Sequence, residues 1–450
     1  MTWPVPARRL AVVAAVATVA LWLLPEFGVT SLRWFEVDNR FLVVNAVLLA
    51  VVVADLLSAP GPRSMAISRN HPRAVTLAQE TSLAWEVEAP PARRWGRMSR
   101  VLLADELAPS LQASTRRVEV EVPRRGTATA TVPLTPTRRG RFEPQELVVR
   151  TSGPLGLMHK QHRRHTPTTL KVLPPFRSAR DAELAIRRAR ILDAGLRSAA
   201  GRGGGTEFDS MRELTPDDET RRIDWAATAR SQRPIVRTYR AERNQTVLCL
   251  LDSGRTMAGR VQGVPRLEFA MDGAMLLAEL ATALGDRVGL MAYDQEVTTS
   301  IQPSNRRSQR ATISERLFDL EPALAESNHH LAVNHVLSRF RRRSLLVLMT
   351  ELVTEPVEQF LLPALPLLIR THVVVVAAVR DPDVAYWSHT TTGDEDGAFL
   401  RASAISALAE RERLAARLRG LGTVVVDAEP DDFARALGDT YLDAKARGRL

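Results

Sequence analysis

Short apolar runs alternate with longer amphipathic stretches through the C-terminal half of the chain. Apolar positions recur every three to four residues from Leu267 to Leu284, which is the spacing of a helix. The apolar runs are nearly continuous in Val, Leu and Ala, as in parallel strands buried on both faces: Thr246–Leu251, Arg287–Tyr293, Ser344–Met349, Val373–Val379 and Thr423–Val426. This alternation predicts a C-terminal α/β, Rossmann-like domain over residues 246–450.

Residues 61–176 follow a different pattern. Apolar and polar residues alternate with a period of two in short segments such as 118–122 and 127–132, and turn-forming Pro and Gly separate these segments. Such alternation is typical of antiparallel strands with one face in a core. We therefore expect a small all-β, sandwich-like or barrel domain here.

Two apolar runs, Leu10–Leu24 and Phe41–Leu57, dominate residues 1–60. Each is slightly shorter than the roughly 20 residues that span a bilayer. A signal peptide is the alternative for the first run, but no small-residue cleavage site follows it. The sequence favours a two-helix transmembrane hairpin in the plasma (inner) membrane. Because arginines crowd its outer flanks, the soluble part is expected in the cytoplasm.

Length and composition limit the remaining choices. The chain has 450 residues, so two to four structural units are expected. Its net charge is +10. The arginines are dispersed and few aromatic residues lie among them, which disfavours a nucleic-acid-binding protein. A single cysteine, Cys249, allows no intramolecular disulfide.

Residues 177–245 form a linker in which residues 181–197 are expected to form a helix. The linker also contains one unusual segment. Thr215, Pro216 and Asp218 have the spacing of a helix N-cap, an N1 proline and a capping acid. The predicted helix carries Ile223 and Trp225 as apolar anchors. Two roles remain open for the segment, a structural brace between domains and a partner-binding surface, and its residues of interest are Asp217, Asp218, Arg222, Asp224, Trp225 and Arg230.

Acidic residues follow the predicted parallel strands, at the edge where open α/β sheets bind ligands. Asp252 follows the first strand and precedes Thr256, while Thr350 and Glu351 follow the third. Carboxylate and hydroxyl oxygens suit Mg²⁺. Two observations count against a metal: carboxylates at strand ends often cap helices, and Arg255 puts a positive charge in the same loop.

Sequence signatures of catalysis are missing. No lysine lies between residues 172 and 444, which excludes a P-loop in the α/β region. The chain has no Gly-x-Ser-x-Gly elbow and no His-Glu-x-x-His motif. Cys249 lies within an apolar strand and is expected to be a core residue. We therefore expect a protein that is not an enzyme.

Several motifs together resemble one bacterial family, the domain of unknown function 58. The most specific runs from Glu207-Phe208 to Arg230 and includes Arg222-Ile223-Asp224-Trp225; others are Arg138–Phe142, Gly153–Leu157, Leu170–Pro174 and Asp286–Leu290. The resemblance implies a von Willebrand factor A-like α/β domain and an association with MoxR-type AAA+ ATPases, for which such proteins act as membrane adaptors.

The same resemblance implies a metal-ion-dependent adhesion site with an Asp-x-Ser-x-Ser loop. Asp252 matches the aspartate of that loop, and Thr256 substitutes for its second serine. Gly254 replaces the first serine. Ser327 stands for the distant threonine, and Glu351 for the final aspartate.

Three functions follow as hypotheses. The first is a membrane-anchored cytoplasmic adaptor, or protein-interaction module, that works with a MoxR-type AAA+ ATPase in a chaperone-like or complex-assembly role. The second is a Mg²⁺-dependent ligand-binding module that uses the degenerate adhesion site. The third is a hydrolase that uses Asp252 or Asp294.

Overall fold

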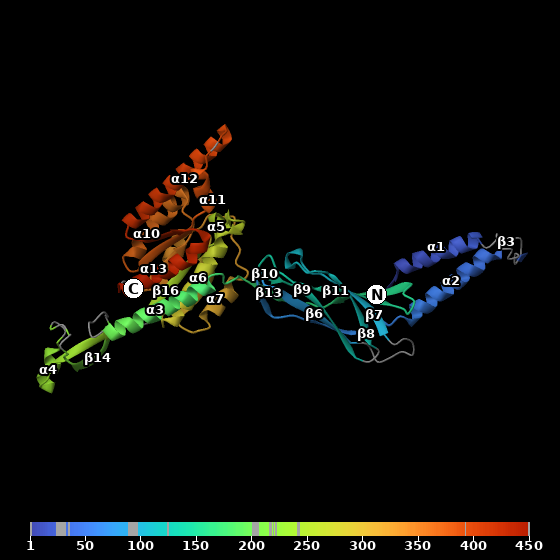
Figure 1. Ribbon diagram of the computed structural model, residues 1–450, viewed down its shortest axis with the longest axis horizontal. Helices are drawn as coiled ribbons and strands as arrows, with labels where there is room; N and C mark the ends of the chain where they lie inside the picture. Colours follow the sequence, from blue (N-terminus) through green and yellow to red (C-terminus); the bar gives the residue numbers. More distant parts are fainter. Residues whose placement is uncertain are drawn as a thin grey trace. The chain divides into compact units, whose positions relative to one another are not determined.

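The computed structural model describes two compact units, Met1–Leu173 and Pro174–Leu450 (Figure 1). The described residues are 2–23, 33–34, 37–88, 98–123, 126–199, 207–215, 218, 220, 223–240, 244–391 and 393–448.

The first unit contains a β-sandwich and two long helices. A five-stranded sheet has the order β1-β12-β11-β7-β8, and two three-stranded sheets have the orders β4-β6-β9 and β10-β13-β5. Its elements are β1 (Trp3–Pro6), α1 (Arg8–Leu23), β2 (Arg33–Trp34), β3 (Val37–Asp38), α2 (Asn39–Ser58), β4 (Ala66–Asn70), β5 (Ala74–Thr76), β6 (Thr81–Glu88), β7 (Met98–Asp105), η2 (Pro109–Leu111), β8 (Arg117–Pro123), β9 (Thr127–Leu134), β10 (Gly140–Phe142), β11 (Glu146–Ser152), β12 (Met158–His165) and β13 (Leu170–Leu173).

Alternation in the sequence determines which side chains enter the sandwich core. In β8, Val120 and Val122 are buried while the intervening Glu121 is exposed. In β9, Val132 and Leu134 are buried in the same way. Side chains from all three sheets meet in one apolar core, so both alternating segments that the sequence predicted are strands of this sandwich.

A buried ion pair lies inside the sandwich. Arg69 donates to both carboxylate oxygens of Asp105, at 2.9 and 2.6 Å, and each of the two side chains is only 1% exposed. The indole Nε1 of Trp85 donates to the same carboxylate at 2.8 Å. Charges that leave water need such partners, so this cluster fixes the packing of β4, β6 and β7.

The predicted transmembrane hairpin is wrong. Among the residues that the structure describes, no helix is both long and apolar enough to cross a membrane.

The C-terminal end of α2 packs against protein. Asp55, in the last turns of α2, is 2% exposed, and its carboxylate accepts hydrogen bonds from the backbone N–H groups of Leu155 and Leu157, both at 2.8 Å. Lys160 of β12 donates to the carbonyl oxygen of Ala59, just after the helix, at 2.6 Å. The second apolar run thus ends inside the first unit, which the sequence pattern does not reveal.

The second unit is built around a six-stranded sheet. Its elements are α3 (Ala179–Ala199), β14 (Glu207–Glu213), α4 (Trp225–Ser231), β15 (Ile235–Arg240), β16 (Thr246–Asp252), α5 (Arg255–Ala258), β17 (Arg260–Val261), β18 (Val264–Pro265), α6 (Arg266–Ala283), β19 (Arg287–Tyr293), β20 (Val297–Ser304), α7 (Gln309–Leu317), α8 (His329–Arg339), β21 (Leu345–Met349), α9 (Thr354–Pro356), η5 (Val357–Leu361), α10 (Leu362–Ile369), β22 (Val373–Val379), α11 (Pro382–His389), α12 (Glu395–Gly420), β23 (Val424–Ala428) and α13 (Pro430–Ala446).

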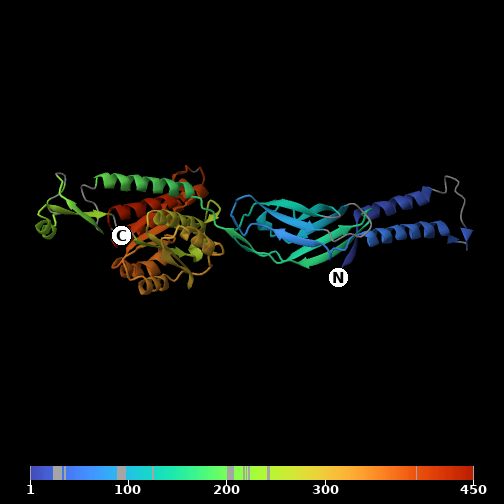
Figure 2. The same cartoon turned by 90° about the horizontal axis from the view of Figure 1, so that it is seen from below.

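The sheet has the order β20-β19-β16-β21-β22-β23 and is parallel except for β20. Helices cover both of its faces (Figures 1 and 2). Cys249 and Leu251 of β16 point into a core shared with α3, α6, α7 and α13. Leu248 and Leu250 point into a second core shared with α8, α10 and α12. This two-sided burial explains why the strand sequences are continuously apolar.

All five predicted strands of the α/β region are present, with ends that differ by at most two residues. The predicted helices at 181–197 and 267–284 correspond to α3 and α6. Strand β20 was not predicted. Its residues alternate between exposed and partly buried because it is the antiparallel edge strand.

Replacing Asp105 tests the buried ion pair. We expect Asp105→Ala to lower the free energy of unfolding of the first unit by about 3–5 kcal/mol. It leaves a guanidinium and an indole N–H in the core without their shared acceptor. Urea unfolding of the full chain measures this change.

Glu121→Ala is the matched control. Glu121 pairs with Arg100 at 3.2 Å, and both side chains are 51% exposed, so its loss should cost less than about 1 kcal/mol. Equal effects of the two variants would contradict the role given to Asp105.

Candidate functional site

The carboxyl ends of the parallel strands meet at one edge of the six-stranded sheet, which we call the carboxyl edge. Asp252 is the last residue of β16, and Thr350 and Glu351 directly follow β21. Asp427 lies in β23. All four side chains are predominantly buried.

Asp252 accepts three hydrogen bonds from within the chain. Its carboxylate is 1% exposed. One oxygen accepts from the backbone N–H of Gly254 at 2.8 Å and from the hydroxyl of Ser327. The other accepts from the hydroxyl of Thr350 at 2.5 Å. Three donors compensate for the loss of water around a buried carboxylate.

A tyrosine–histidine pair lies beside this carboxylate. The Tyr293 hydroxyl is 2.9 Å from Nδ1 of His329, and both side chains are buried. Burial lowers the pKa of His329 below its ordinary value, although the negative charge of Asp252 acts in the opposite direction. Burial, and secondly Asp252, raises the pKa of Tyr293 well above its ordinary value. Both rings are therefore neutral near pH 7.

Glu351 is engaged by two arginines. Nε of Arg266, the first residue of α6, is 2.9 Å from one carboxylate oxygen, and Arg411 of α12 pairs with the other. Arg411 also contacts Asp427 at 2.9 Å. Burial alone would lower the pKa of Arg411, but the two carboxylates raise it above its ordinary value.

The predicted metal ligands do not form a cation site as they are placed. Asp252 and Ser327 contact each other, Thr256 lies in the short helix α5, and Glu351 is neutralised by arginines. No group of three or more His, Cys, Asp and Glu side chains that could hold a metal ion occurs in the described part of the chain. The residues present do not fit Mg²⁺, which needs oxygen ligands that are free to coordinate.

The unusual segment of the linker lies in a small arm made of β14, α4 and β15, with the two strands paired antiparallel. The described part of the helix predicted from Thr215 begins at Trp225, and residues 216, 217, 219, 221 and 222 lie outside the described residues. Asp218 receives two hydrogen bonds from Arg212, at 2.6 and 2.7 Å, and two from Thr215, of which the one from the Thr215 N–H is the bond expected of the predicted capping acid. The bonds from Arg212 hold the pKa of Asp218 far below its usual range.

Asp224 caps α4 and holds it against β15. Its carboxylate accepts from the backbone N–H of Ala227 at 2.9 Å and from Nε of Arg237 at 2.7 Å. Trp225, one of the two predicted apolar anchors, is 71% exposed. Arg230 is also exposed. Asp217 and Arg222, which the sequence also singled out, lie outside the described residues.

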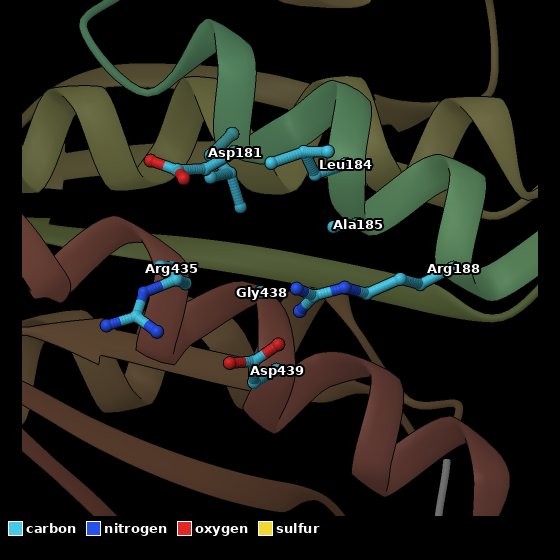
Figure 3. Close-up of a pocket in the computed structure, with 8 residues that line it drawn as sticks. Asp181, Leu184, Ala185, Arg188, Arg435, Gly438 and Asp439 are labelled. Atoms are coloured by element: carbon cyan, nitrogen blue, oxygen red, sulfur yellow. The ribbon is translucent and has the colours of Figure 1, made fainter.

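A pocket between α3 and α13 is lined by side chains of both charges (Figure 3). Asp181 and Arg188 come from α3, and Arg435 and Asp439 come from α13. Arg435 already pairs with Asp432, and this hydrogen bond raises its pKa. Opposite charges from two packed helices are typical of a helix–helix contact, so we do not treat this pocket as the functional site.

Comparisons with known proteins agree with the resemblance expected from the sequence. Residues 210–385 match the model of the family described as protein of unknown function DUF58. These residues belong to the DUF58 family. The arm and the carboxyl edge through β22 lie within this DUF58 region, whereas α12, β23 and α13 follow it.

Relatives at the level of sequence are uncharacterized. Proteins of Mycobacterium tuberculosis (Rv1480) and Mycobacterium bovis (Mb1516) are each 22% identical over 262 residues, which are 55% of this chain and 82% of theirs.

Solved structures give weaker matches. BatB from Bacteroides thetaiotaomicron is 16% identical and covers 44% of this chain and 99% of its own, with a TM-score of 0.30. An aerotolerance-related membrane protein from Bacteroides fragilis has the same identity and coverage, with a TM-score of 0.31. The vWF domain of the pilus tip protein Mfa5 from Porphyromonas gingivalis is 18% identical over 24% of this chain and 38% of its own, with a TM-score of 0.20.

The buried His329 makes stability depend on pH. Its pKa in the folded state is below the ordinary 6.5 of the unfolded chain, so the unfolded state binds the proton more readily. The contribution of neutral His329 to the free energy of unfolding is therefore present above about pH 6.5. It is lost as the pH falls, by at most about 1.4 kcal/mol per pH unit. We expect His329→Gln to reduce the loss of unfolding free energy between about pH 7 and about pH 5.

His389→Gln is the control, because His389 is exposed at the end of α11 and is not among the groups that shift the pKa of His329. It should leave the pH dependence of the unfolding free energy unchanged. His372 is also buried and its pKa is lowered by burial, so part of the acid sensitivity should survive in His329→Gln. An unaltered slope in His329→Gln would contradict the assignment.

Proposed function

We propose that the DUF58 region is a docking module that binds a MoxR-type AAA+ ATPase, in a complex-assembly or chaperone-like role. The exposure of Trp225 carries the proposal. Tryptophan supplies a large apolar area and one N–H donor, and it is enriched among the residues that dominate protein–protein binding. An indole left in water on a folded arm gains that energy only when a partner covers it.

The arm presents this indole on an ordered support. Asp224 caps α4 directly before Trp225 and pairs with Arg237 of β15. Asp218 pairs with Arg212 of β14. Less side-chain and backbone entropy is lost on binding when the contact residue is already held in place. These ion pairs therefore support a role for Asp218 and Asp224 in positioning the arm.

The carboxyl edge favours binding over turnover. A carboxylate nucleophile needs an oxygen that can attack the substrate, and both oxygens of Asp252 accept hydrogen bonds from the chain itself. The hypothesis of a hydrolase that uses Asp252 gains no support from this arrangement. Mg²⁺-dependent ligand binding gains none from the pairing of Glu351 with arginines.

We place the encounter with the ATPase in the cytoplasm, where ATP is available. The single cysteine is compatible with a reducing compartment. Cys249 is buried in β16, and burial raises the pKa of its thiol to about 12, so it is an inert core residue.

Substitution of Trp225 tests the proposal. The full chain and the MoxR-type ATPase encoded nearest to it should bind each other in titration calorimetry. Trp225→Ala should weaken this binding by about 30-fold or more, as expected for a residue worth about 2 kcal/mol. Melting temperatures should agree between the variant and the wild type, because the side chain is exposed.

Trp387→Ala provides the matched control. Trp387 lies on α11, is 37% exposed and follows the DUF58 region. It should bind the ATPase as the wild type does. Binding that survives in Trp225→Ala, or that never forms with any MoxR-type ATPase of the host, contradicts the proposal.

A further inference from the structure

Four charged side chains form an ion-pair network at the carboxyl edge. Arg266 and Arg411 both pair with Glu351, and Arg411 also pairs with Asp427. Their side chains are 16%, 13%, 6% and 13% exposed, in the order Arg266, Arg411, Glu351 and Asp427. Two positive and two negative groups balance, so the network is neutral without any bound ion.

The network connects both helical layers to the sheet. Arg266 begins α6, which packs in the core on one face, and Arg411 belongs to α12, which packs in the core on the other face. Glu351 follows the central strand β21 and lies between them. Removing one member of a buried ion pair leaves an uncompensated charge, so the network has a structural role.

The charges of these four side chains already cancel, so the network has no excess negative charge that a divalent cation would neutralise. The family resemblance puts Glu351 in the position of the last acidic ligand. One of its oxygens instead accepts a hydrogen bond from Arg411, and the other lies 2.9 Å from Nε of Arg266 without a hydrogen bond. A cation bound there would be repelled by the two guanidinium groups, whose positive charges already lie beside Glu351.

The Asp252 loop also departs from the resembling loop. Gly254 stands where the resembling loop has its first serine. A Cβ atom at Gly254 would lie 2.0 Å from the Ser327 hydroxyl oxygen and 2.9 Å from the carbonyl oxygen of Ala325. The loop therefore has no space for a side chain at this position, and the hydroxyl of Ser327 donates a hydrogen bond to Asp252.

We infer that the guanidinium groups of Arg266 and Arg411 take the place of the divalent cation at this edge, and that the domain folds and binds without a metal ion. The positive charge that a metal would supply is built into the chain. Binding to a partner is then insensitive to chelators, and the acidic residues of the edge serve to join α6, β21, α12 and β23.

The metal ions alone are the first probe. The full chain is titrated with MgCl₂ and with MnCl₂ by calorimetry, and its melting temperature is measured with millimolar metal and with EDTA. We expect no saturable heat and no shift in melting temperature, since a ligand that binds only the folded state must raise it. Saturable binding of either ion that disappears in Asp252→Asn overturns the inference.

Substitution of Arg411 is the second probe. Arg411→Met removes one guanidinium and should lower the melting temperature by several degrees. Arg413→Met is the matched control, because Arg413 is exposed on the same helix, and it should melt as the wild type does. An Arg411→Met protein as stable as the control contradicts the structural role of the network.

Gly254→Ser asks whether the family loop can be restored. We expect it to lower the melting temperature and to gain no affinity for Mg²⁺ or Mn²⁺, because the serine would collide with Ser327. A stable Gly254→Ser protein that binds either ion would overturn the inference. None of these measurements involves the ATPase, so their outcome is separate from that of the proposed docking function.

Discussion

Buried carboxylates must be compensated, and this constraint shapes both units of the protein. A charge removed from water is costly unless hydrogen bonds or an opposite charge replace the water. Asp55 is compensated by backbone N–H groups, Asp105 by Arg69 and Trp85, and Asp252 by a backbone N–H group and two hydroxyls. Asp286 accepts from Tyr441 and Lys445, both at 2.5 Å. Each acid is used to hold the chain together.

The same constraint separates the carboxyl edge from the arm. At the edge, the acidic groups that invite a catalytic or metal-binding interpretation are already bonded to the chain. In the arm, Asp218 and Asp224 are also bonded within the chain, but Trp225, which directly follows Asp224, exposes its indole to solvent. The edge is therefore a structural junction, whereas the arm exposes Trp225, on which the proposed docking function rests.

Local sequence patterns predicted most elements of the α/β region. Its parallel strands follow from continuous apolar runs and helix α6 from apolar positions three to four residues apart, whereas the polar edge strand β20 has neither pattern. The sequence patterns did not predict which residues far apart in the chain would pair. Nothing near Glu351 in the chain indicates that Arg266 and Arg411 would reach it. The described part of the helix predicted from Thr215 begins only at Trp225, where Asp224 provides the N-cap, and the transmembrane hairpin failed because no described helix is both long and apolar enough to cross a membrane.

Hydrogen–deuterium exchange of the full chain, with and without the MoxR-type ATPase proposed as its partner, tests the account most directly. If the arm is the docking element and the carboxyl edge an internal junction, the ATPase will slow exchange in α4 and β15, and exchange after Asp252 and Glu351 will be slow and unchanged. Protection that appears at the carboxyl edge while the arm exchanges as in the free protein would contradict this account.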